Sequence, residues 1–195
     1  MKLQLVPIGE VDRRLLEELR ATLATMFRGE CEVLGTAGTS VRSEVRPEAG
    51  ALGWNGFNPE FAYHPERQQY HSSEILARMQ QSLPDDCWRL LGVTAVDLYI
   101  PILTFVFGEA QMGGRCALVS LHRLRQEFYG LAPDQQLLRE RLVKEAIHEL
   151  GHTLELTHCD DYTCVMAASH AVEWIDIKEP RLCSVCYAKV LAMSQ

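Results

Sequence analysis

The sequence predicts a mixed α/β (α+β) fold, in which helices cover a twisted sheet of about five strands and a small lobe closes the carboxyl end. The chain opens with a strand–helix–strand pattern, a long helical pattern begins near Pro133, and four of the seven cysteines follow residue 158. A length of 195 residues suits one domain with its own core. We expect a sheet-and-helix subdomain over residues 1–154 and a carboxyl-terminal subdomain over residues 155–195.

The amino-terminal pattern predicts two parallel strands joined by a helix. Lys2 to Ile8 reads as a strand, Val11 to Phe27 carries apolar residues at helical spacing, and Cys31 to Leu34 reads as a second strand. Such a β-α-β unit has a right-handed crossover.

The middle of the chain begins with a long irregular segment, Gly35 to Glu66, which has no sustained period. Such a segment either contributes to a substrate cleft or is a simple loop on the surface. A helix is expected from Glu74 to Leu83, with Ser73 as its cap and Pro84 as its stop.

Three further strands complete the predicted sheet. Ala95 to Ile100 follows Gly92, Thr104 to Phe107 is rich in aromatic and β-branched residues, and Cys116 to Leu121 follows a turn at Gly113 and Gly114.

The long helix starts at Pro133 and Asp134 and is expected to run to about Leu154. An apolar stripe at four-residue spacing should face the sheet; it consists of Leu138, Leu142, Ala146 and Leu150. His148 and His152 fall on a different face of this helix, so core packing and metal binding use separate sides.

The residues from His148 to His152 read H-E-x-x-H, a zinc-binding pattern on a helix. Two imidazoles four residues apart reach one Zn²⁺ at about 2.0–2.1 Å, and Glu149 lies close enough to take a proton from water without being a ligand. If the helix ends near Leu154 or Glu155 and the chain doubles back, His158 can supply a third nitrogen. Three histidines and one water form a catalytic zinc site with an open position.

This segment resembles the metzincin zinc peptidases, whose pattern is H-E-x-x-H-x-x-G-x-x-H followed by a Met-turn. It is most similar to the archaemetzincins, in which a cysteine directly follows the third histidine, as Cys159 follows His158. The resemblance implies a metzincin-like fold and a zinc metallopeptidase with Glu149 as general base and Met166 in the Met-turn. It leaves open whether peptides are cleaved from the amino end. It also places a substrate-pairing antiparallel edge strand around Leu103 to Gly108.

A second stretch similar to the archaemetzincins is Arg67-Gln68-Gln69-Tyr70, an R-x-Q-Y element that precedes a helix.

Glu155 departs from the family pattern, which has glycine at this position. The glycine permits a backbone reversal, often with positive φ. A residue with a side chain in that conformation costs on the order of 1–2 kcal/mol. We expect the turn to form despite this cost, because the free energy of zinc binding is larger.

The cysteine spacing predicts a second, structural zinc. Cys159 and Cys164 form C-x4-C, and Cys183 and Cys186 form C-x-x-C, which together fit a closed site of four thiolates. The alternative is a redox pair at Cys183 and Cys186, but no thioredoxin-like context surrounds it. The other three cysteines are expected to be buried hydrophobic residues; they are Cys31, Cys87 and Cys116.

Composition limits the partners. The net charge of −7 argues against non-specific binding to nucleic acid or to an anionic membrane, and no apolar run is long enough to span a bilayer. The first ten residues do not form a secretory signal, so we expect a cytoplasmic monomer that acts on peptides. The rival from another functional class is a non-catalytic protein with two structural zinc sites.

Overall fold

The computed structural model describes residues 2–35 and 57–193. A five-stranded mixed sheet has the order β2-β1-β5-β8-β7. Its strands are β1 (Lys2–Ile8), β2 (Glu30–Val33), β5 (Arg89–Thr94), β7 (Gly108–Ala110) and β8 (Cys116–Ser120). β2, β1, β5 and β8 are mutually parallel, whereas β7 pairs antiparallel with β8 at one edge. The predicted mixed sheet and the parallel pair joined by a helix are therefore confirmed.

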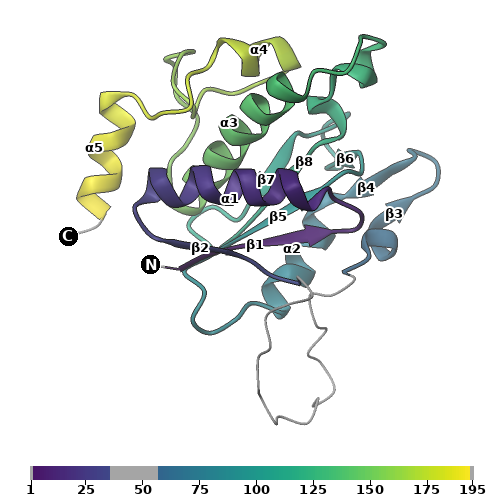
Figure 1. Ribbon diagram of the computed structural model, residues 1–195, viewed down its shortest axis with the longest axis horizontal. Coiled ribbons are helices and arrows are strands. Elements are labelled where there is room, and N and C mark those ends of the chain that lie inside the picture. The colour runs from purple at the N-terminus through teal and green to yellow at the C-terminus, as the bar shows by residue number, and fades with distance from the viewer. Residues whose placement is uncertain (1, 36–56, 194–195) are drawn as a thin grey trace.

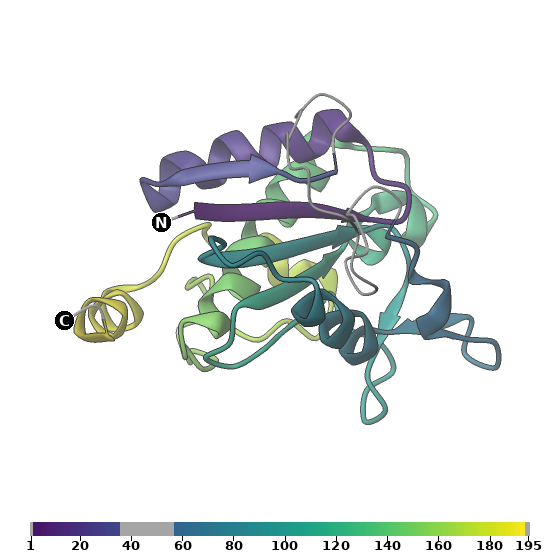
Figure 2. The same ribbon diagram turned by 90° about the horizontal axis from the view of Figure 1, so that it is seen from below.

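The sheet separates two hydrophobic cores because side chains alternate between its faces. Leu3 and Leu5 of β1 belong to the core beneath α1 (Arg13–Phe27) and α3 (Gln135–Thr153). Val6 and Ile8 of the same strand belong to the core beneath α2 (Ser72–Gln81). Figures 1 and 2 show α1 and α3 on one face of the sheet and α2 on the other.

The central strand differs from the predicted one. It is Arg89–Thr94 and contains Gly92, whereas the sequence suggested Ala95 to Ile100. A Cβ at Gly92 would lie 2.9 Å from the Met79 sulfur and 3.0 Å from a Leu118 methyl group, so this glycine lets α2 pack closely. Gly92, which suggested a strand boundary in the sequence, is therefore a position inside the strand where close packing requires glycine.

A second sheet of three short strands has the order β3-β4-β6. Its strands are β3 (Tyr63–His64), β4 (Gln69–His71) and β6 (Leu98–Tyr99). Only part of the predicted irregular segment is described; residues 36–56 lie outside the described residues. Its final portion contains the 3-10 helix η1 (Pro59–Ala62) and strand β3 rather than a plain loop.

Two further local predictions were wrong. Ser73 is not the cap of α2, which starts one residue before it; its hydroxyl instead donates to Glu109 at 2.8 Å. Residues Thr104 to Phe107 are not a strand, although Val106 forms an isolated bridge with Leu98. The antiparallel edge strand is Gly108–Ala110, so it overlaps the predicted range only at Gly108.

The long helix α3 closely follows its predicted range. Asp134 caps it by accepting a hydrogen bond from the backbone of Leu137 at 2.9 Å. The predicted stripe is buried: Leu138, Leu142, Ala146 and Leu150 are each at most 4% exposed.

The remaining elements surround this frame. They are η2 (His122–Leu124), η3 (Gln126–Tyr129), α4 (Val172–Ile177) and α5 (Ser184–Met193). A cysteine cluster sits at the carboxyl end, where α5 lies beside the main body (Figures 1 and 2). No helix within the described ranges has the length and apolar character needed to cross a membrane. The boundary between the two subdomains stays a prediction.

Candidate metal centre and active site

The three predicted histidines converge at the carboxyl end of α3. Their ligand atoms all lie within 4.8 Å of one another. The Nδ1 atoms of His148 and His152 face the carbonyls of Val165 and Leu156, at 2.8 and 2.7 Å. Each Nδ1 therefore carries the proton as a donor, and each Nε2 presents a lone pair to a metal.

The turn after α3 brings His158 back toward the helix. Glu155 adopts φ 60°, a left-handed conformation. The N–H of Glu155 donates to the carbonyl of His152 at 3.0 Å, and that of Leu156 donates to Gly151 at 3.1 Å. These two bonds form a Schellman motif, whose left-handed position usually holds glycine. The expected reversal with positive φ at Glu155 is confirmed.

The spacing of the nitrogens fits a zinc ion. Two nitrogens bound to one zinc at about 2.0–2.1 Å with tetrahedral angles are roughly 3.3 Å apart. The Nε2 atoms of His148 and His152 are 3.1 Å apart. The ring centroid of His158 lies 5.3 Å from that of His148 and 5.1 Å from that of His152. Three neutral imidazoles in this arrangement are a donor set that zinc favours.

Burial keeps these imidazoles neutral. Loss of solvent around His148 holds its pKa well below the usual value, and the nearby charge of Lys178 acts in the same direction. Burial also lowers the pKa of His152 and of His158. Neutral rings are required for metal ligation, so burial favours the protonation state that can bind a metal ion.

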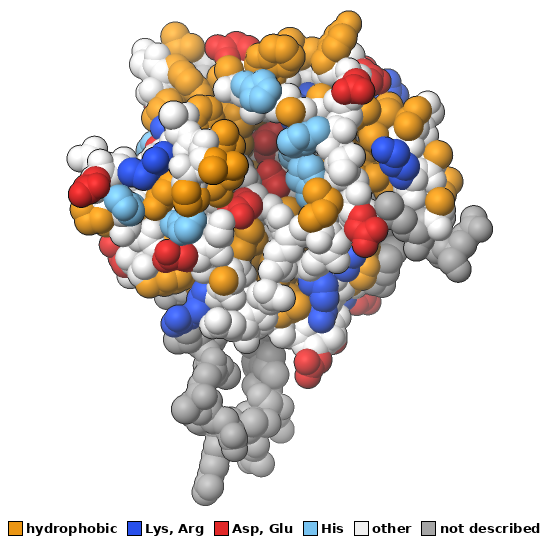
Figure 3. All heavy atoms as spheres, turned by 180° about the vertical axis from the view of Figure 1, so that it is seen from behind, with side chains coloured by type: hydrophobic (Ala, Val, Ile, Leu, Met, Phe, Trp, Pro, Cys, Tyr) orange, Lys and Arg blue, Asp and Glu red, His pale blue; other side chains and the backbone are white. Residues whose placement is uncertain are grey.

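A cleft of about 580 Å³ passes over the histidines. Figure 3 shows it as a hollow with acidic side chains in its depth, beside the histidines. Glu149 lines this cleft and is only 5% exposed. Burial raises the pKa of its carboxyl group well above the usual value, and the charge of Glu145 raises it further. A carboxylate with a raised pKa accepts a proton readily near neutral pH.

The edge strand β7 approaches Glu149 very closely. A Cβ on Gly108 would lie 2.6 Å from Oε1 of Glu149 and 2.6 Å from the carbonyl of Leu118. Only glycine fits between α3 and β8 at this point. The free edge of β7 thus borders the predicted general base.

Met166 is fully buried and packs against Gly151, which precedes His152 in the helix. A Cβ added to Gly151 would meet its sulfur at 2.4 Å, so the glycine in H-E-L-G-H makes room for this thioether. Because the neighbouring Val165 carbonyl orients His148, the turn around Met166 helps to position the histidine cluster.

The four predicted cysteines form a separate cluster. Their sulfur atoms lie within 4.8 Å of one another, and those of Cys159 and Cys183 are 3.8 Å apart. Four thiolates at about 2.3 Å from one zinc give sulfur separations of roughly 3.8 Å. The backbone N–H of Cys186 lowers the pKa of the Cys183 thiol to about 7, which favours its thiolate.

The other three cysteines lie outside this cluster. Cys87 and Cys116 are buried, at 2% and 0% exposure, and Cys31 is half-buried. Burial raises the pKa of Cys31 and Cys116 to about 12 and that of Cys87 to about 11, which disfavours the reactive thiolate form of all three.

Sequence reasoning missed a buried ion pair in the site. Lys178 Nζ donates to Oε1 of Glu145 at 3.2 Å, and both side chains are at most 3% exposed. Glu145 lines the cleft, and burial raises its pKa. Its position four residues before Glu149, on the same helix face, was a usable signal. No local pattern identifies Lys178, because its partner is 33 residues away.

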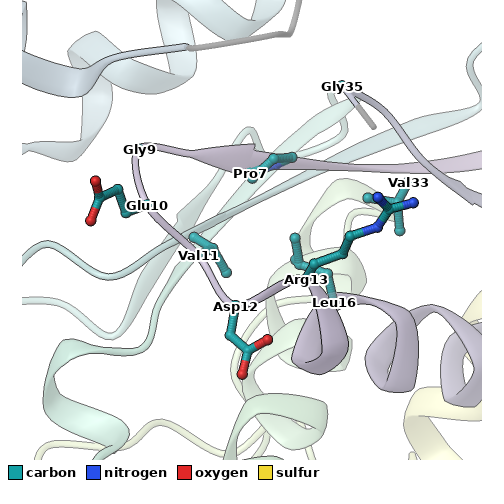
Figure 4. A pocket seen from close by; sticks show the side chains of 9 residues that line it. All are labelled: Pro7, Gly9, Glu10, Val11, Asp12, Arg13, Leu16, Val33 and Gly35. Carbon is teal, nitrogen blue, oxygen red and sulfur yellow. The ribbon is translucent and has the colours of Figure 1, made fainter. Parts of the chain in front are cut away.

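Another cavity of about 450 Å³ opens at the turn between β1 and α1 (Figure 4). Asp12 on its lining caps α1 by accepting from the Arg14 backbone at 2.8 Å. None of the lining residues is a histidine or cysteine, and we assign this cavity no part in the chemistry of the site.

Comparison with known proteins identifies the family. The sequence model of peptidase family M54 matches residues 59–192. The chain belongs to peptidase family M54, the archaemetzincins. The archaemetzincin of Methanocaldococcus jannaschii is 40% identical over 190 residues, which cover 97% of this chain and 93% of that protein. The protein is therefore a zinc metallopeptidase that acts on peptides, and the family predicted from the sequence is confirmed.

Solved archaemetzincin structures share the fold. The structure from Methanopyrus kandleri aligns with a TM-score of 0.76 at 31% identity, covering 100% of this chain and 95% of that one. The Archaeoglobus fulgidus archaemetzincin, complexed with malonate, aligns with a TM-score of 0.72 at 33% identity, covering 97% and 99%. The metzincin-like mixed α/β fold is thereby confirmed.

Proposed function

We propose that this archaemetzincin hydrolyses peptide bonds at a zinc ion held by His148, His152 and His158, with Glu149 as the general base. The observation that carries the proposal is the convergence of three imidazoles, with ligand atoms within 4.8 Å of one another, in a cleft lined by a buried carboxylate. A bound zinc ion supplies Lewis acidity, which polarises a carbonyl and makes water acidic near neutral pH.

The chain's own residues supply positioning and proton transfer. The free edge of β7 offers N–H and C=O groups to an extended peptide along the cleft. A carboxylate oxygen of Glu149 takes the proton of the attacking water and passes it to the leaving amine. The raised pKa of this carboxyl group suits it to hold the proton between the two steps.

Substitution of Glu149 by Gln tests this assignment. The amide preserves size and cannot accept the proton, so peptide hydrolysis should fall by at least about a thousandfold. Zinc content, measured by atomic absorption, should match that of the unchanged protein. Hydrolysis that survives in the variant removes Glu149 from the role. An unchanged protein that retains zinc but cleaves no peptide favours the non-catalytic alternative with two structural zinc sites.

We further propose two zinc ions per chain, the second held by Cys159, Cys164, Cys183 and Cys186. Proximity of the four sulfur atoms supports this set. All seven cysteines are free, and zinc thiolates persist in a reducing compartment, which supports a cytoplasmic location. A monomer is proposed as the working unit; sedimentation of the zinc-loaded protein tests it.

For the position of cleavage, we propose attack near the amino end of short peptides. The likeness to the archaemetzincins supports this proposal; Glu145 lines the cleft, but its carboxylate is already paired with Lys178. Matched peptides with free and acetylated amino ends test this idea. Equal cleavage of the two would exclude it.

A further inference from the structure

The R-x-Q-Y element of the sequence has no place in the metal chemistry, yet it contacts one wall of the cleft. That wall is the cleft rim, residues 103–109, all of which line the cleft. The element begins in the turn after β3 and continues into β4, and β4 leads directly into α2 (Figure 1).

Arg67 binds the first part of the cleft rim. Its Nη2 donates to the carbonyls of Leu103 and Thr104, at 2.9 and 3.0 Å. Its guanidinium lies 4.2 Å over the Tyr99 ring, which fixes its plane. A planar, charged donor can serve several acceptors in one geometry, which a lysine cannot reproduce.

Gln69 reinforces the same point. Its Nε2 donates to the Thr104 carbonyl at 3.0 Å and to Asp97 at 2.9 Å, while Oε1 accepts from Arg67 at 3.1 Å. Asp97 is held in turn by Arg123, through two bonds of 2.6 and 2.7 Å. The Arg123 guanidinium lies 4.1 Å over the ring of Phe105, a cleft-rim residue.

The far end of the cleft rim is held by the start of α2. Glu109 accepts hydrogen bonds from the hydroxyls of Ser72 and Ser73. The Ser72 hydroxyl also reaches the Tyr99 carbonyl at 3.1 Å. One short segment, Arg67 to Ser73, therefore forms hydrogen bonds with both ends of the cleft rim.

These contacts matter because the sheet secures only part of the cleft rim. Pairing with β8 covers Gly108 to Ala110, and residues 103–105 have no ladder partner. The Gly108 backbone also lies so close to Glu149 that a single Cβ would not fit. A small displacement of the cleft rim would therefore change the gap in which a peptide and the Glu149 carboxylate meet.

We propose that Arg67, Gln69, Ser72 and Ser73 are positioning residues that hold the cleft rim at the distance from α3 required by an extended peptide. The inference rests on the proposed function, since it assumes that peptides bind in this cleft. It assigns a role in peptide binding to residues that do not contact the metal ligands.

The test compares two zinc-binding probes on the zinc-loaded protein. Acetohydroxamate reports on the metal centre alone, whereas a tripeptidyl hydroxamate also occupies the cleft beside the rim. In Arg67→Ala, affinity for the tripeptidyl probe should fall about tenfold, as expected for lost charge-assisted hydrogen bonds, while acetohydroxamate affinity stays unchanged. Amide hydrogen exchange over residues 103–110 should accelerate by about tenfold.

Arg78→Ala is the matched control. Arg78 lies on α2, where its guanidinium is 5.3 Å over the Phe61 ring instead of on the cleft rim. Neither probe affinity nor exchange over residues 103–110 should change in this variant. If Arg67→Ala does not accumulate as folded protein, Arg67→Lys carries the same test, with an expected loss of about threefold because lysine lacks the planar fork.

Two results would overturn the proposal. One is an equal loss of both probes, which would mean that Arg67 supports the metal centre as a whole. The other is an unchanged ratio of tripeptidyl hydroxamate affinity to acetohydroxamate affinity, even if amide hydrogen exchange over residues 103–110 accelerates. Binding of acetohydroxamate is independent of peptide hydrolysis, so failure of this inference and failure of the proposed function are distinguishable.

Discussion

The histidine and cysteine clusters place their ligands by different means. His148 and His152 stand one turn apart on a 19-residue helix, and backbone carbonyls orient both rings. The cysteines come from the turn after His158 and from the start of α5. The histidine cluster is thus built largely on one helix, whereas the cysteine cluster joins the turn after His158 to the start of α5.

Burial around α5 supports this contrast. Val185, Tyr187 and Leu191 are 63%, 56% and 50% exposed, so the helix gains little from packing. Closed thiolate sites contribute to folding, whereas open histidine sites serve catalysis. We therefore expect metal loss to unfold the carboxyl-terminal segment from one cluster and to abolish activity without unfolding from the other.

Substitution of Cys164 should have the largest effect. Structural zinc contributes about 10 kcal/mol or more at neutral pH, so Cys164→Ala should lose one zinc and expose residues 160–193 to proteases. The matched control is Cys116→Ala, since Cys116 is equally buried but outside the cluster. Zinc content and limited proteolysis measure the outcome. Full zinc retention in Cys164→Ala would remove this residue from the ligand set.

Substitution of His158 should separate activity from stability. His158 is an exposed side chain, so with no zinc at the histidine cluster His158→Ala should change the free energy of unfolding by no more than about 0.5 kcal/mol. Zinc affinity of the histidine cluster should fall more than about a hundredfold, beyond the loss typical of an outer-shell change. Competition with a chelator and urea unfolding report the two quantities. Unchanged zinc affinity would exclude His158 as a ligand.

Glu155→Gly probes the turn between the two clusters. Glycine relieves the left-handed strain of on the order of 1–2 kcal/mol, so zinc affinity of the histidine cluster should be kept or improved. A chelator titration measures it. A loss of about tenfold would give Glu155 a role of its own; its carboxylate would lie 3.0 Å from a Cβ placed on Gly113.

The smallest effect is expected for Asp97→Asn. Its stability, measured over a range of pH, tests a charge interaction that does not involve the metal clusters. Burial alone would raise the pKa of Asp97, but hydrogen bonds from Arg123 and Gln69 outweigh it, and the pKa lies below the usual value. The ionised form therefore stabilises the fold at neutral pH, and this contribution disappears as the pH falls through the depressed pKa. The variant should be less stable by about 1 kcal/mol at pH 7. Urea unfolding should show this gap closing in acid; a constant gap would contradict the linkage.

Local sequence determined which candidate metal ligands lie together. The H-E-x-x-H spacing fixes two imidazoles on one helix face, and the reversal at Glu155 follows from the distance that His158 must cover. The short intervals within each cysteine pair predicted that the thiols would meet, and the four sulfur atoms lie within 4.8 Å of one another. Even the apolar stripe of α3 follows from a period that needs no knowledge of its partners.

Tertiary packing decided the rest. In the sequence, Gly92 suggested a break before the strand. In the structure it lies inside the central strand, where the close approach of the Met79 sulfur leaves no room for a side chain. Other contacts join positions more than thirty residues apart. Lys178 pairs with Glu145, and Arg67 donates hydrogen bonds to the carbonyls of residues 103 and 104. Periodicity reports which face of an element is apolar, but it does not report what lies against that face. The shape of the cleft depends on these distant contacts, and only the folded chain brings them together.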